Sequence, residues 1–182
     1  MPVAGTSMSE SELITKARKR NKKAQSMLYH RYKNLWFAIC LRYNHNQFDA
    51  EDCLQNALVK IFSKLGQFDS RKGRFKDWAN RIVVNENLLF LRQRTKDRKM
   101  TEGITPETVS QPESSENTLS PERMTRLIQK LPEGYRNVFN LYVMEGYNHK
   151  EIGQILDISV GTSKSQLHKA RKMLQQELEV LL

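Results

Sequence analysis

The stretch "ISVGTSKSQLHKARKML", residues 158–174, decides the fold of the C-terminal half of the chain. Leu167, Ala170 and Leu174 recur at the spacing of one helix face, and Ser163 lies one turn earlier on that face. The opposite side carries only cations and hydrogen-bonding groups, namely Lys164, Ser165, His168, Lys169, Arg171 and Lys172. The stretch therefore predicts a helix with one buried face and one solvated, basic face.

The residues just before this helix predict the element on which it packs. Asn148 and Glu151 have the spacing of a capping box, and a short apolar helix follows over residues 152–156. Gly153 permits another helix to approach closely, and residues 157–159 form a turn with Ser159 as N-cap. A short helix, a tight turn and a longer basic helix are typical of a helix-turn-helix that reads the major groove. The alternative is an ordinary helical hairpin with a solvated cationic face.

Net charge divides the chain into three parts. Residues 1–100 hold 21 Lys/Arg and 9 Asp/Glu, whereas residues 101–120 hold four Glu and no base. Residues 121–182 hold nine Lys/Arg and seven Asp/Glu. The middle part is rich in Ser, Thr and Pro and has almost nothing to bury, which predicts a flexible acidic linker. We expect an all-α protein of two small helical domains, 10–96 and 121–182, with a disordered tail over 1–9 and a linker over 97–120.

Helical spacing also dominates the N-terminal half. Ser9 and Glu12 form a second predicted capping box. In the C-terminal half, two further helices are expected over residues 121–131 and 133–145, the first of them capped by Ser120 and started by Pro121. The segment after residue 47 places one apolar stripe on a helix: Leu54, Ala57, Leu58, Ile61 and Leu65. A fourth helix from about residue 74 to residue 96 is expected to bury Phe75, Trp78, Ile82 and Leu89.

The helix of residues 47–65 also has an acidic face, made of Asp49, Glu51, Asp52, Gln55 and Asn56. Three interpretations stay open. The acids could be metal ligands or an acid/base pair of a nucleic-acid enzyme, or they could favour the helix dipole on a solvated face. Because an acidic face repels phosphate, it could instead dock a basic partner helix. Two absences argue against catalysis. The sequence has no glycine-rich phosphate loop, and its histidines are scattered and not clustered, at His30, His45, His149 and His168.

Residues 68–99 interleave aromatic and amide side chains with many cations. Phe68 fits the helix stripes less well than Phe75 and Trp78 do, so a surface role is open to it. Cations that follow a phosphate backbone beside rings that take unstacked bases suit single-stranded DNA. The basic residues expected to contribute are Arg74, Lys76, Arg81, Arg92 and Arg94.

The remaining composition bounds the class of protein. The net charge of +10 and the pI of about 9.7 point to a polyanionic partner. Cys40 and Cys53 lack metal-ligand spacing and fall in apolar helical patterns, so we expect buried, reduced thiols. No apolar run approaches a membrane span, and the first 20 residues lack a signal-peptide core. A soluble, cytoplasmic protein is expected.

Three segments in this order resemble the bacterial extracytoplasmic-function sigma factors, the small two-domain members of the sigma-70 family. They are "DAEDCLQNALVKIFSKL", "FKDWANRIVVNENLLFLR" and "LPEGYRNVFNLYVMEGYNHKEIGQILDISVGTSKSQLHKAR". The resemblance implies that residues 10–96 are region 2 and residues 121–182 are region 4. It also implies binding to core RNA polymerase, through the β′ clamp helices and the β flap, and to promoter DNA, both duplex and melted non-template strand. It implies no enzyme activity, no cofactor and no metal.

The resemblance assigns roles to individual residues. Asp49, Asp52 and Gln55 match the helix that docks on the clamp helices, while Phe68 and Asn85 match positions that take or read bases of the −10 element. The positions of the helix that reads the −35 element are matched by Lys164, Ser165, Gln166, His168 and Lys169.

Two departures from the family pattern lie in the predicted recognition helix. The family usually has Val at the position of Ser163 and often Arg at the position of Gln166. A polar Ser163 on the buried face predicts weaker packing, so Ser163→Val is expected to stabilise region 4. The small net charge of region 4 suggests help from another DNA-bound protein, and an anti-sigma factor is a further candidate partner. The rival functions are a helix-turn-helix regulator that is no polymerase subunit, and a metal-dependent nucleic-acid enzyme.

Overall fold

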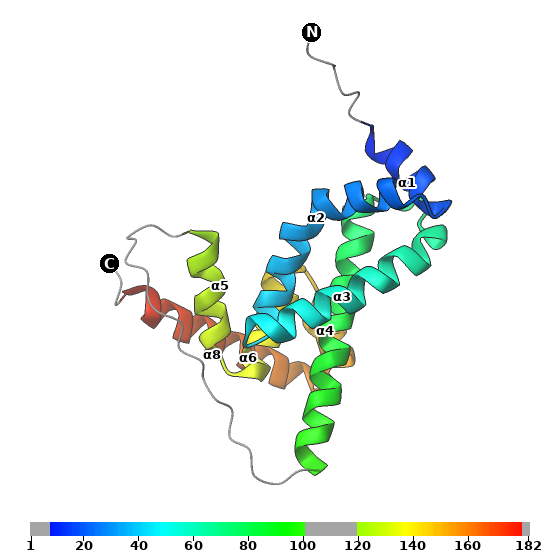
Figure 1. Ribbon diagram of the computed structural model, residues 1–182. Helices are drawn as coiled ribbons and strands as arrows, with labels where there is room; N and C mark the ends of the chain where they lie inside the picture. Colours follow the sequence, from blue (N-terminus) through cyan, green and yellow to red (C-terminus); the bar gives the residue numbers. More distant parts are fainter. Residues whose placement is uncertain (1–7, 101–119, 180–182) are drawn as a thin grey trace. The chain divides into compact units, whose positions relative to one another are not determined.

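The computed structural model describes residues 8–100 and 120–179, and in residues 95–100 it describes the backbone alone. All regular structure in these ranges is helical, which confirms the all-α prediction. The elements, shown in Figure 1, are α1 (Glu10–Arg18), α2 (Lys22–Tyr43), α3 (Gln47–Lys64), a 3₁₀ turn η1 (Leu65–Gln67), α4 (Phe75–Met100), α5 (Pro121–Lys130), α6 (Glu133–Phe139), a π-helical turn η2 (Asn140–Met144), α7 (His149–Leu156) and α8 (Val160–Glu179). The predicted linker falls largely on residues 101–119, outside the described ranges, and α4 continues past its expected end at residue 96.

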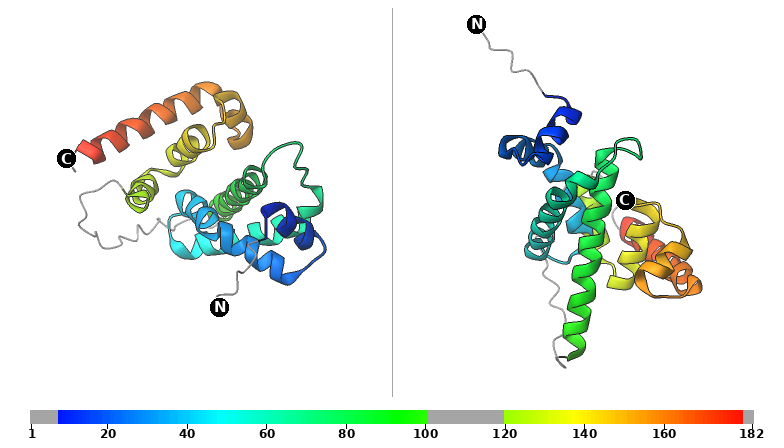
Figure 2. Two further views of the ribbon diagram at one scale, coloured as in Figure 1. Left: turned by 90° about the horizontal axis from the view of Figure 1, so that it is seen from above. Right: turned by 90° about the vertical axis from the view of Figure 1, so that its right-hand side faces the viewer.

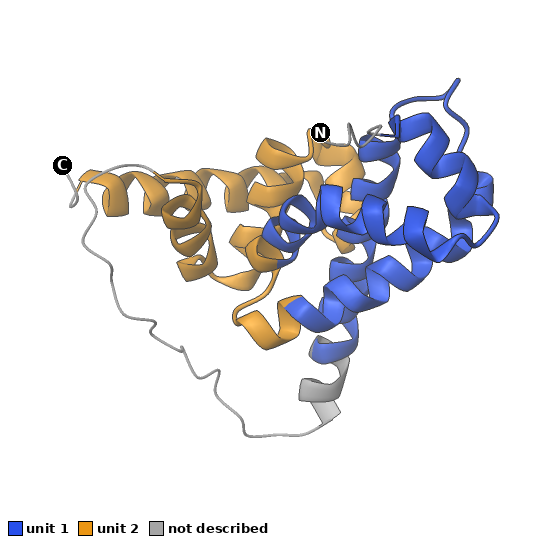
Figure 3. Ribbon diagram, turned by 45° about the horizontal axis from the view of Figure 1, so that its top comes forward, with its two compact units in different colours: residues 1–40, 51–102 blue, residues 41–50, 103–182 orange. Residues whose placement is uncertain are grey.

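The chain forms two compact units, coloured separately in Figure 3. Among the described residues, unit 1 holds 8–40 and 51–100, and unit 2 holds 41–50 and 120–179. The end of α2 and the start of α3 thus belong with the C-terminal helices in unit 2. Each unit has its own apolar core.

The first helix of unit 1 begins as the sequence predicts. The Ser9 hydroxyl accepts from the backbone N–H of Glu12, and the Glu12 carboxylate accepts from the N–H of Ser9, so the capping box is complete. These contacts lower the pKa of Glu12. At the other end, the Arg18 guanidinium donates to the carbonyls of Leu65 and Phe68 and so ties α1 to the turn after α3.

An aromatic cluster fills the centre of unit 1. Trp36 and Phe75 are fully buried, and the ring centroids of Phe68 lie 5.5 Å from those of Phe75 and Trp78. Tyr32 stacks on Trp36 with centroids 5.2 Å apart. Burial and a hydrogen bond to a carboxylate raise the pKa of the Tyr32 hydroxyl. Of the predicted stripe of α3, Leu54, Ala57, Ile61 and Leu65 are buried and Leu58 is partly buried.

The buried face of α4 differs from the predicted one. Trp78 and Ile82 are only partly buried, and Leu89 is 41% exposed. Its neighbours Leu88 and Leu91 are only 4% and 5% exposed. The reason is Asn87, a polar residue with no exposed surface, whose amide donates to the carbonyl of Val83 at 2.8 Å. The buried ridge follows steps of four through Val83 and Asn87 to Leu91, and Leu89 lies beside this ridge.

The two cysteines are buried and unbridged, as expected. Cys40 and Cys53 are 0% and 1% exposed, and neither forms a disulfide. The Asn87 amide nitrogen lies 3.4 Å from the Cys40 sulfur. The thiols therefore serve as small apolar side chains of the core.

In unit 2, α8 packs against α5, α6 and α7, as Figure 2 shows. Two amide side chains satisfy the last carbonyls of α2, which have no partner inside their own helix. Gln129 donates to the carbonyls of Leu41 at 2.9 Å and Asn44 at 3.2 Å, and Asn140 donates to the carbonyl of Arg42 at 2.9 Å. These bonds explain why the end of α2 is part of unit 2.

A buried arginine, Arg136, supports the same contact. It has no exposed surface, it donates to the Gln129 carbonyl at 3.1 Å, and its two terminal nitrogens lie 3.0 and 2.9 Å from the ring nitrogens of His45. Beside it, Arg42 and Glu145 form an ion pair at 2.9 Å that is mostly shielded from solvent. Burial raises the pKa of Glu145 although Arg42 opposes the shift. Local sequence pattern does not predict this contact, because His45 and Arg136 lie far apart in the chain.

The rotation of α4 can be tested with two adjacent leucines. Leu88→Ala should lower the free energy of unfolding by about 2–5 kcal/mol because it leaves a cavity in a packed core. Leu89→Ala should lower it by less than about 1 kcal/mol because the side chain already contacts solvent. Urea unfolding of the full chain, followed by circular dichroism, measures both. Equal losses would show that α4 buries a different face.

Candidate nucleic-acid interface

The helix-turn-helix forms from α7 and α8 as predicted. The Asn148 side chain accepts from the backbone N–H groups of Lys150 and Glu151 at 3.0 Å, and the Glu151 carboxylate accepts from the N–H of Asn148 at 2.8 Å. Ser159 caps α8, because its hydroxyl accepts from the N–H of Thr162 at 2.9 Å. Both ends of the turn are thus fixed by local hydrogen bonds.

Between the two helices the chain turns through Asp157, which adopts a left-handed conformation with φ 56° and ψ 50°. The Ile158 N–H then donates to the Gly153 carbonyl at 3.0 Å. A Cβ at Gly153 would lie 2.8 Å from the Ile158 carbonyl oxygen. The missing side chain at Gly153 therefore makes room for the backbone of the turn. The sequence had suggested that it makes room for a neighbouring helix.

The two faces of α8 divide as the sequence predicts. Ser163, Leu167, Ala170 and Leu174 are buried. The residues exposed on the other side are Lys164, Ser165, His168, Lys169, Arg171 and Lys172. Since no acid accompanies them, this face offers a row of cations and hydrogen-bond donors to a polyanion.

Ser163 is buried but not a packing fault. It has no exposed surface, and its hydroxyl lies 2.9 Å from Nδ1 of His149. Val at this position would remove that hydrogen bond and leave the His149 nitrogen without this partner. The expected gain in stability from Ser163→Val, which rested on a polar residue on the buried face, is therefore opposed by the loss of this hydrogen bond.

Gln166 is set apart from the other predicted recognition residues. It is only partly exposed, and a Cβ on Gly134 would lie 3.1 Å from its Nε2 atom. Its Oε1 atom is buried without a hydrogen-bond partner. The structure thus places the Gln166 amide against the start of α6 and not among the exposed cations.

In unit 1 a second basic surface follows α4. Arg81, Asn85 and Arg92 are exposed and lie four and seven residues apart, which puts them on one face. Lys76 is exposed on another side of α4, five residues before Arg81, and Arg94 is partly buried. At the start of the helix, Arg74 pairs with Asp77 through bonds of 2.8 and 3.1 Å, which lower the pKa of Asp77.

Phe68 lies in the core and not on the surface. The ring is 7% exposed, it belongs to the aromatic cluster, and the Arg18 guanidinium lies 5.9 Å from its centroid. The Phe68 ring therefore has no open face on which a base could stack. What is exposed is the following loop, including Arg71, Lys72 and Gly73.

The acidic face of α3 is present, with Glu51, Gln55 and Asn56 exposed and Asp52 partly buried. Asp49 is engaged in the helix start, because its backbone N–H donates to the Asn46 side chain at 2.8 Å and its carboxylate accepts from that side chain at 3.0 Å. Within the described residues, no three His, Cys, Asp or Glu side chains are grouped as metal ligands.

Two apolar residues that the sequence pattern did not single out lie on the same side of α3. Phe48 and Val59 are 72% and 70% exposed. Both fall outside the buried stripe of this helix, which is the signal that could have identified them. Large apolar side chains beside acids and amides are typical of a surface that contacts another protein.

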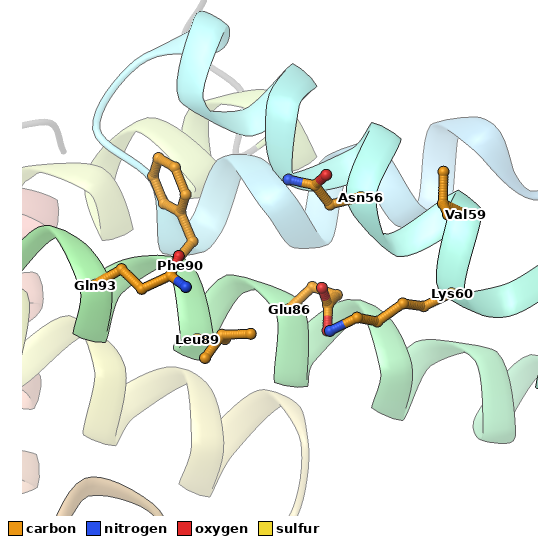
Figure 4. A pocket seen from close by; sticks show the side chains of 7 residues that line it. All are labelled: Asn56, Val59, Lys60, Glu86, Leu89, Phe90 and Gln93. Atoms are coloured by element: carbon orange, nitrogen blue, oxygen red, sulfur yellow. The ribbon is translucent and has the colours of Figure 1, made fainter.

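A shallow groove adjoins this surface between α3 and α4 (Figure 4). Its volume is about 290 Å³, and an ion pair of 2.6 Å between Lys60 and Glu86 crosses it. The lining residues are Asn56, Val59, Lys60, Glu86, Leu89, Phe90 and Gln93. Leu89 on α4 and Val59 on α3 are thus both exposed apolar residues that line this groove.

Comparison with known proteins decides the family. The chain matches the models of sigma-70 region 2 over residues 28–97 and sigma-70 region 4 over residues 122–174. It is 30% identical over 162 residues to the ECF RNA polymerase sigma factor SigW of Bacillus subtilis, covering 82% of this chain and 86% of the relative. The chain belongs to the extracytoplasmic-function sigma factors. It is therefore an RNA polymerase sigma factor, a subunit for transcription initiation.

Other relatives span nearly the whole chain. This sigma factor is 26% identical to the RNA polymerase sigma-H factor of Pseudomonas aeruginosa, with 97% of each chain covered, and 26% identical to the ECF RNA polymerase sigma-E factor of Escherichia coli, with 96% and 97% covered. Its fold resembles that of the sigma factor RpoE of Bartonella quintana, solved in complex with the anti-sigma factor NepR, with a TM-score of 0.59 and 22% identity over 85% of this chain and 96% of that one.

None of the helices in residues 8–100 and 120–179 has the length and apolar character needed to cross a membrane.

Two glycines test the geometry of the helix-turn-helix. Gly153→Ala should cost about 1–3 kcal/mol of stability, because its Cβ meets a backbone carbonyl at 2.8 Å. Gly161→Ala meets only the Ser159 hydroxyl at 3.6 Å and should be neutral or stabilise by up to about 1 kcal/mol. Thermal unfolding of the full chain compares them. A Gly153→Ala variant as stable as the parent would contradict this geometry of the turn.

Proposed function

We propose that this sigma factor divides its work between two regions, with residues 10–96 acting as region 2, residues 97–120 as linker and residues 121–182 as region 4. Region 2 docks on core RNA polymerase through α3 and binds the −10 element through α4, and region 4 binds the −35 element through α8. The observation that carries the proposal is the separation of charge. An acidic, amide-bearing face on α3 stands apart from basic faces on α4 and α8.

The face of α3 suits the polymerase better than it suits DNA. Glu51 and Asp52 would repel a phosphate backbone, whereas they attract a basic helix such as those of the β′ clamp. Phe48 and Val59 add exposed apolar surface that a protein partner can bury. Asp49 then acts mainly by starting α3, since its carboxylate is bonded to Asn46.

The face of α4 suits melted DNA. Arg81 and Arg92 can follow the backbone of the non-template strand, with the Asn85 amide between them to read a base edge. Arg74, just before α4, extends this basic surface, and Lys76 and Arg94 add cations on another side of the helix. The buried Phe68 ring supports the loop that follows it, and the exposed residues of that loop contact the DNA base.

The face of α8 suits duplex DNA. The first residues of a recognition helix reach base edges, so Lys164, Ser165 and His168 are placed to read the −35 sequence. Lys169, Arg171 and Lys172 lie further along and are placed to hold phosphates. Gln166 contributes through its contact with α6, which steadies α8.

The proposal extends to the setting of the protein. Sigma factors are initiation factors without catalytic activity, and this chain is assigned no reaction, cofactor or metal. Since its polymerase lies in the bacterial cytoplasm, we place the protein there. An anti-sigma factor, the β flap and a DNA-bound recruiting protein complete the set of candidate partners, and RpoE of Bartonella quintana supports the first of these because it was solved with an anti-sigma factor.

Reconstituted transcription tests the function as a whole. The purified full chain is added to core RNA polymerase of its own bacterium, with fragmented genomic DNA as template, and the 5′ ends of the transcripts are mapped. New start sites that depend on the chain and share two upstream elements are expected. A chain that binds DNA but directs no new transcripts would instead be a helix-turn-helix regulator.

The docking face can be tested by reversing one charge. Asp52→Arg should weaken binding to core polymerase by about 2 kcal/mol or more, because a favourable contact becomes a repulsive one. Binding is measured by competition with a labelled parent chain. The control is Glu122→Arg, an equal change of charge at the exposed start of α5, which should bind as the parent does. Equal effects would show that net charge, and not the α3 face, controls docking.

The −10 surface can be tested by separating melting from binding. Asn85→Ala leaves an exposed position and should not change stability, but it should slow the formation of the open complex on duplex promoters. A template with a pre-melted −10 region should restore most of the lost activity. Phe68→Ala serves as contrast, because loss of a buried ring should cost about 3–5 kcal/mol of stability. Open complexes are counted by permanganate footprinting, and an Asn85→Ala variant that opens duplex DNA normally would overturn the assignment.

A further inference from the structure

Four side chains from three elements form a continuous column behind α8. Ser163 Oγ lies 2.9 Å from Nδ1 of His149 at the start of α7. The His149 ring stacks on Tyr142 of η2, with centroids 4.6 Å apart and planes inclined by 24°. The Arg171 guanidinium carbon lies over the Tyr142 ring, 5.8 Å from its centroid. Both ends of the column, Ser163 and Arg171, thus belong to α8.

The geometry of the column limits how α8 and Arg171 can move. The Tyr142 ring thus contacts both the His149 ring and the Arg171 guanidinium. Ser163 and Arg171 are eight residues apart, or about 12 Å along the helix axis. Ser163 contacts the His149 ring, Arg171 contacts the Tyr142 ring, and the two rings are stacked on each other. Two linked contacts at this separation restrain the rotation of α8 about its axis and the direction of the Arg171 side chain.

A guanidinium held over a ring still has its donors available. A cation–π contact uses the charge of the guanidinium and not its hydrogen-bond donors, so a phosphate can still accept from its N–H groups. A side chain already ordered loses less rotamer freedom on binding than a mobile one does. Tyr142 can therefore orient Arg171 without competing for the phosphate.

We propose that Tyr142 is a positioning residue for DNA binding, with His149 and Ser163 as its support: it holds Arg171 in the orientation that meets a backbone phosphate of the −35 duplex. The proposal rests on the proposed function, in which the exposed face of α8 contacts DNA. It goes beyond that function by assigning a role to residues that do not reach the DNA themselves.

A double-mutant cycle on the full chain tests the proposal. The probe is a 30-base-pair duplex that the parent selects from a random-sequence library, with a scrambled duplex of equal composition beside it. Tyr142→Leu should bind both duplexes about two- to fivefold more weakly, which is the size expected of an exposed cation–π contact. Tyr142→Phe keeps the ring and should bind as the parent does.

Coupling to Arg171 separates positioning from a general effect on stability. In an Arg171→Ala background, Tyr142→Leu should cause no further loss, because the group it positions is absent. Arg171→Ala alone should also lower the slope of log affinity against log salt by about one, whereas Tyr142→Leu should leave the slope unchanged. The matched control is Tyr135→Leu, whose ring lies under Lys169 at 5.8 Å, and its effect should persist in the Arg171→Ala background.

Each outcome decides the question. Parental affinity of Tyr142→Leu, or an equal loss in both backgrounds, overturns the proposal. If Tyr142→Leu is too unstable to measure, the Arg171 Nε–H resonance replaces it: an upfield ring-current shift in the parent and in Tyr142→Phe is expected, and its absence from the parent overturns the proposal. A parent chain that selects no duplex at all would instead contradict the DNA-binding role of α8, so the two failures are distinguishable.

Discussion

The contact between the Ile158 carbonyl and Gly153 sets the angle at which α8 leaves α7. The oxygen would lie 2.8 Å from a Cβ, so only a residue without a side chain admits this path of the backbone. The left-handed Asp157 and the Ser159 cap fix the residues on either side. Everything that α8 presents depends on this turn, because a rotation of the helix would exchange its buried face for its basic one.

Charge is then organised by element. The two basic faces lie on α4 and α8, whereas the acidic face lies on α3. One chain therefore offers surfaces of opposite charge to different partners. The net charge of +10 conceals this arrangement, since it averages over both kinds of surface. A basic protein can therefore carry an acidic docking face without losing its attraction for nucleic acid.

Local patterns predicted much of this structure. The capping boxes at Ser9 and Asn148, the cap at Ser159 and the stripes of α3 and α8 depend on residues within a few positions of one another. All of them are confirmed except at Leu58, which is only partly buried. The family resemblance was likewise readable from three ordered segments.

The errors concern contacts between distant residues. Leu89 was placed inside because no local pattern shows that the polar Asn87 continues the buried ridge of α4. Phe68 was open to a surface role, and Ser163 was read as a defect, because the rings and the histidine that surround them come from elsewhere in the chain. Arg136 and Tyr142 gave no signal, since a buried cation and a supporting ring are recognised only by their neighbours.

The amide bonds that end α2 have a practical consequence for dissecting the molecule. Gln129 and Asn140 supply donors to the carbonyls of Leu41, Arg42 and Asn44. A chain shortened to its N-terminal half would lose these donors, so the last turn of α2 would have to recruit water or unwind. Because α3 begins just beyond that turn, truncation disturbs the very helix whose binding it is meant to isolate. Point substitutions on the exposed face of α8 would leave these amide bonds in place, since neither Gln129 nor Asn140 lies on that helix.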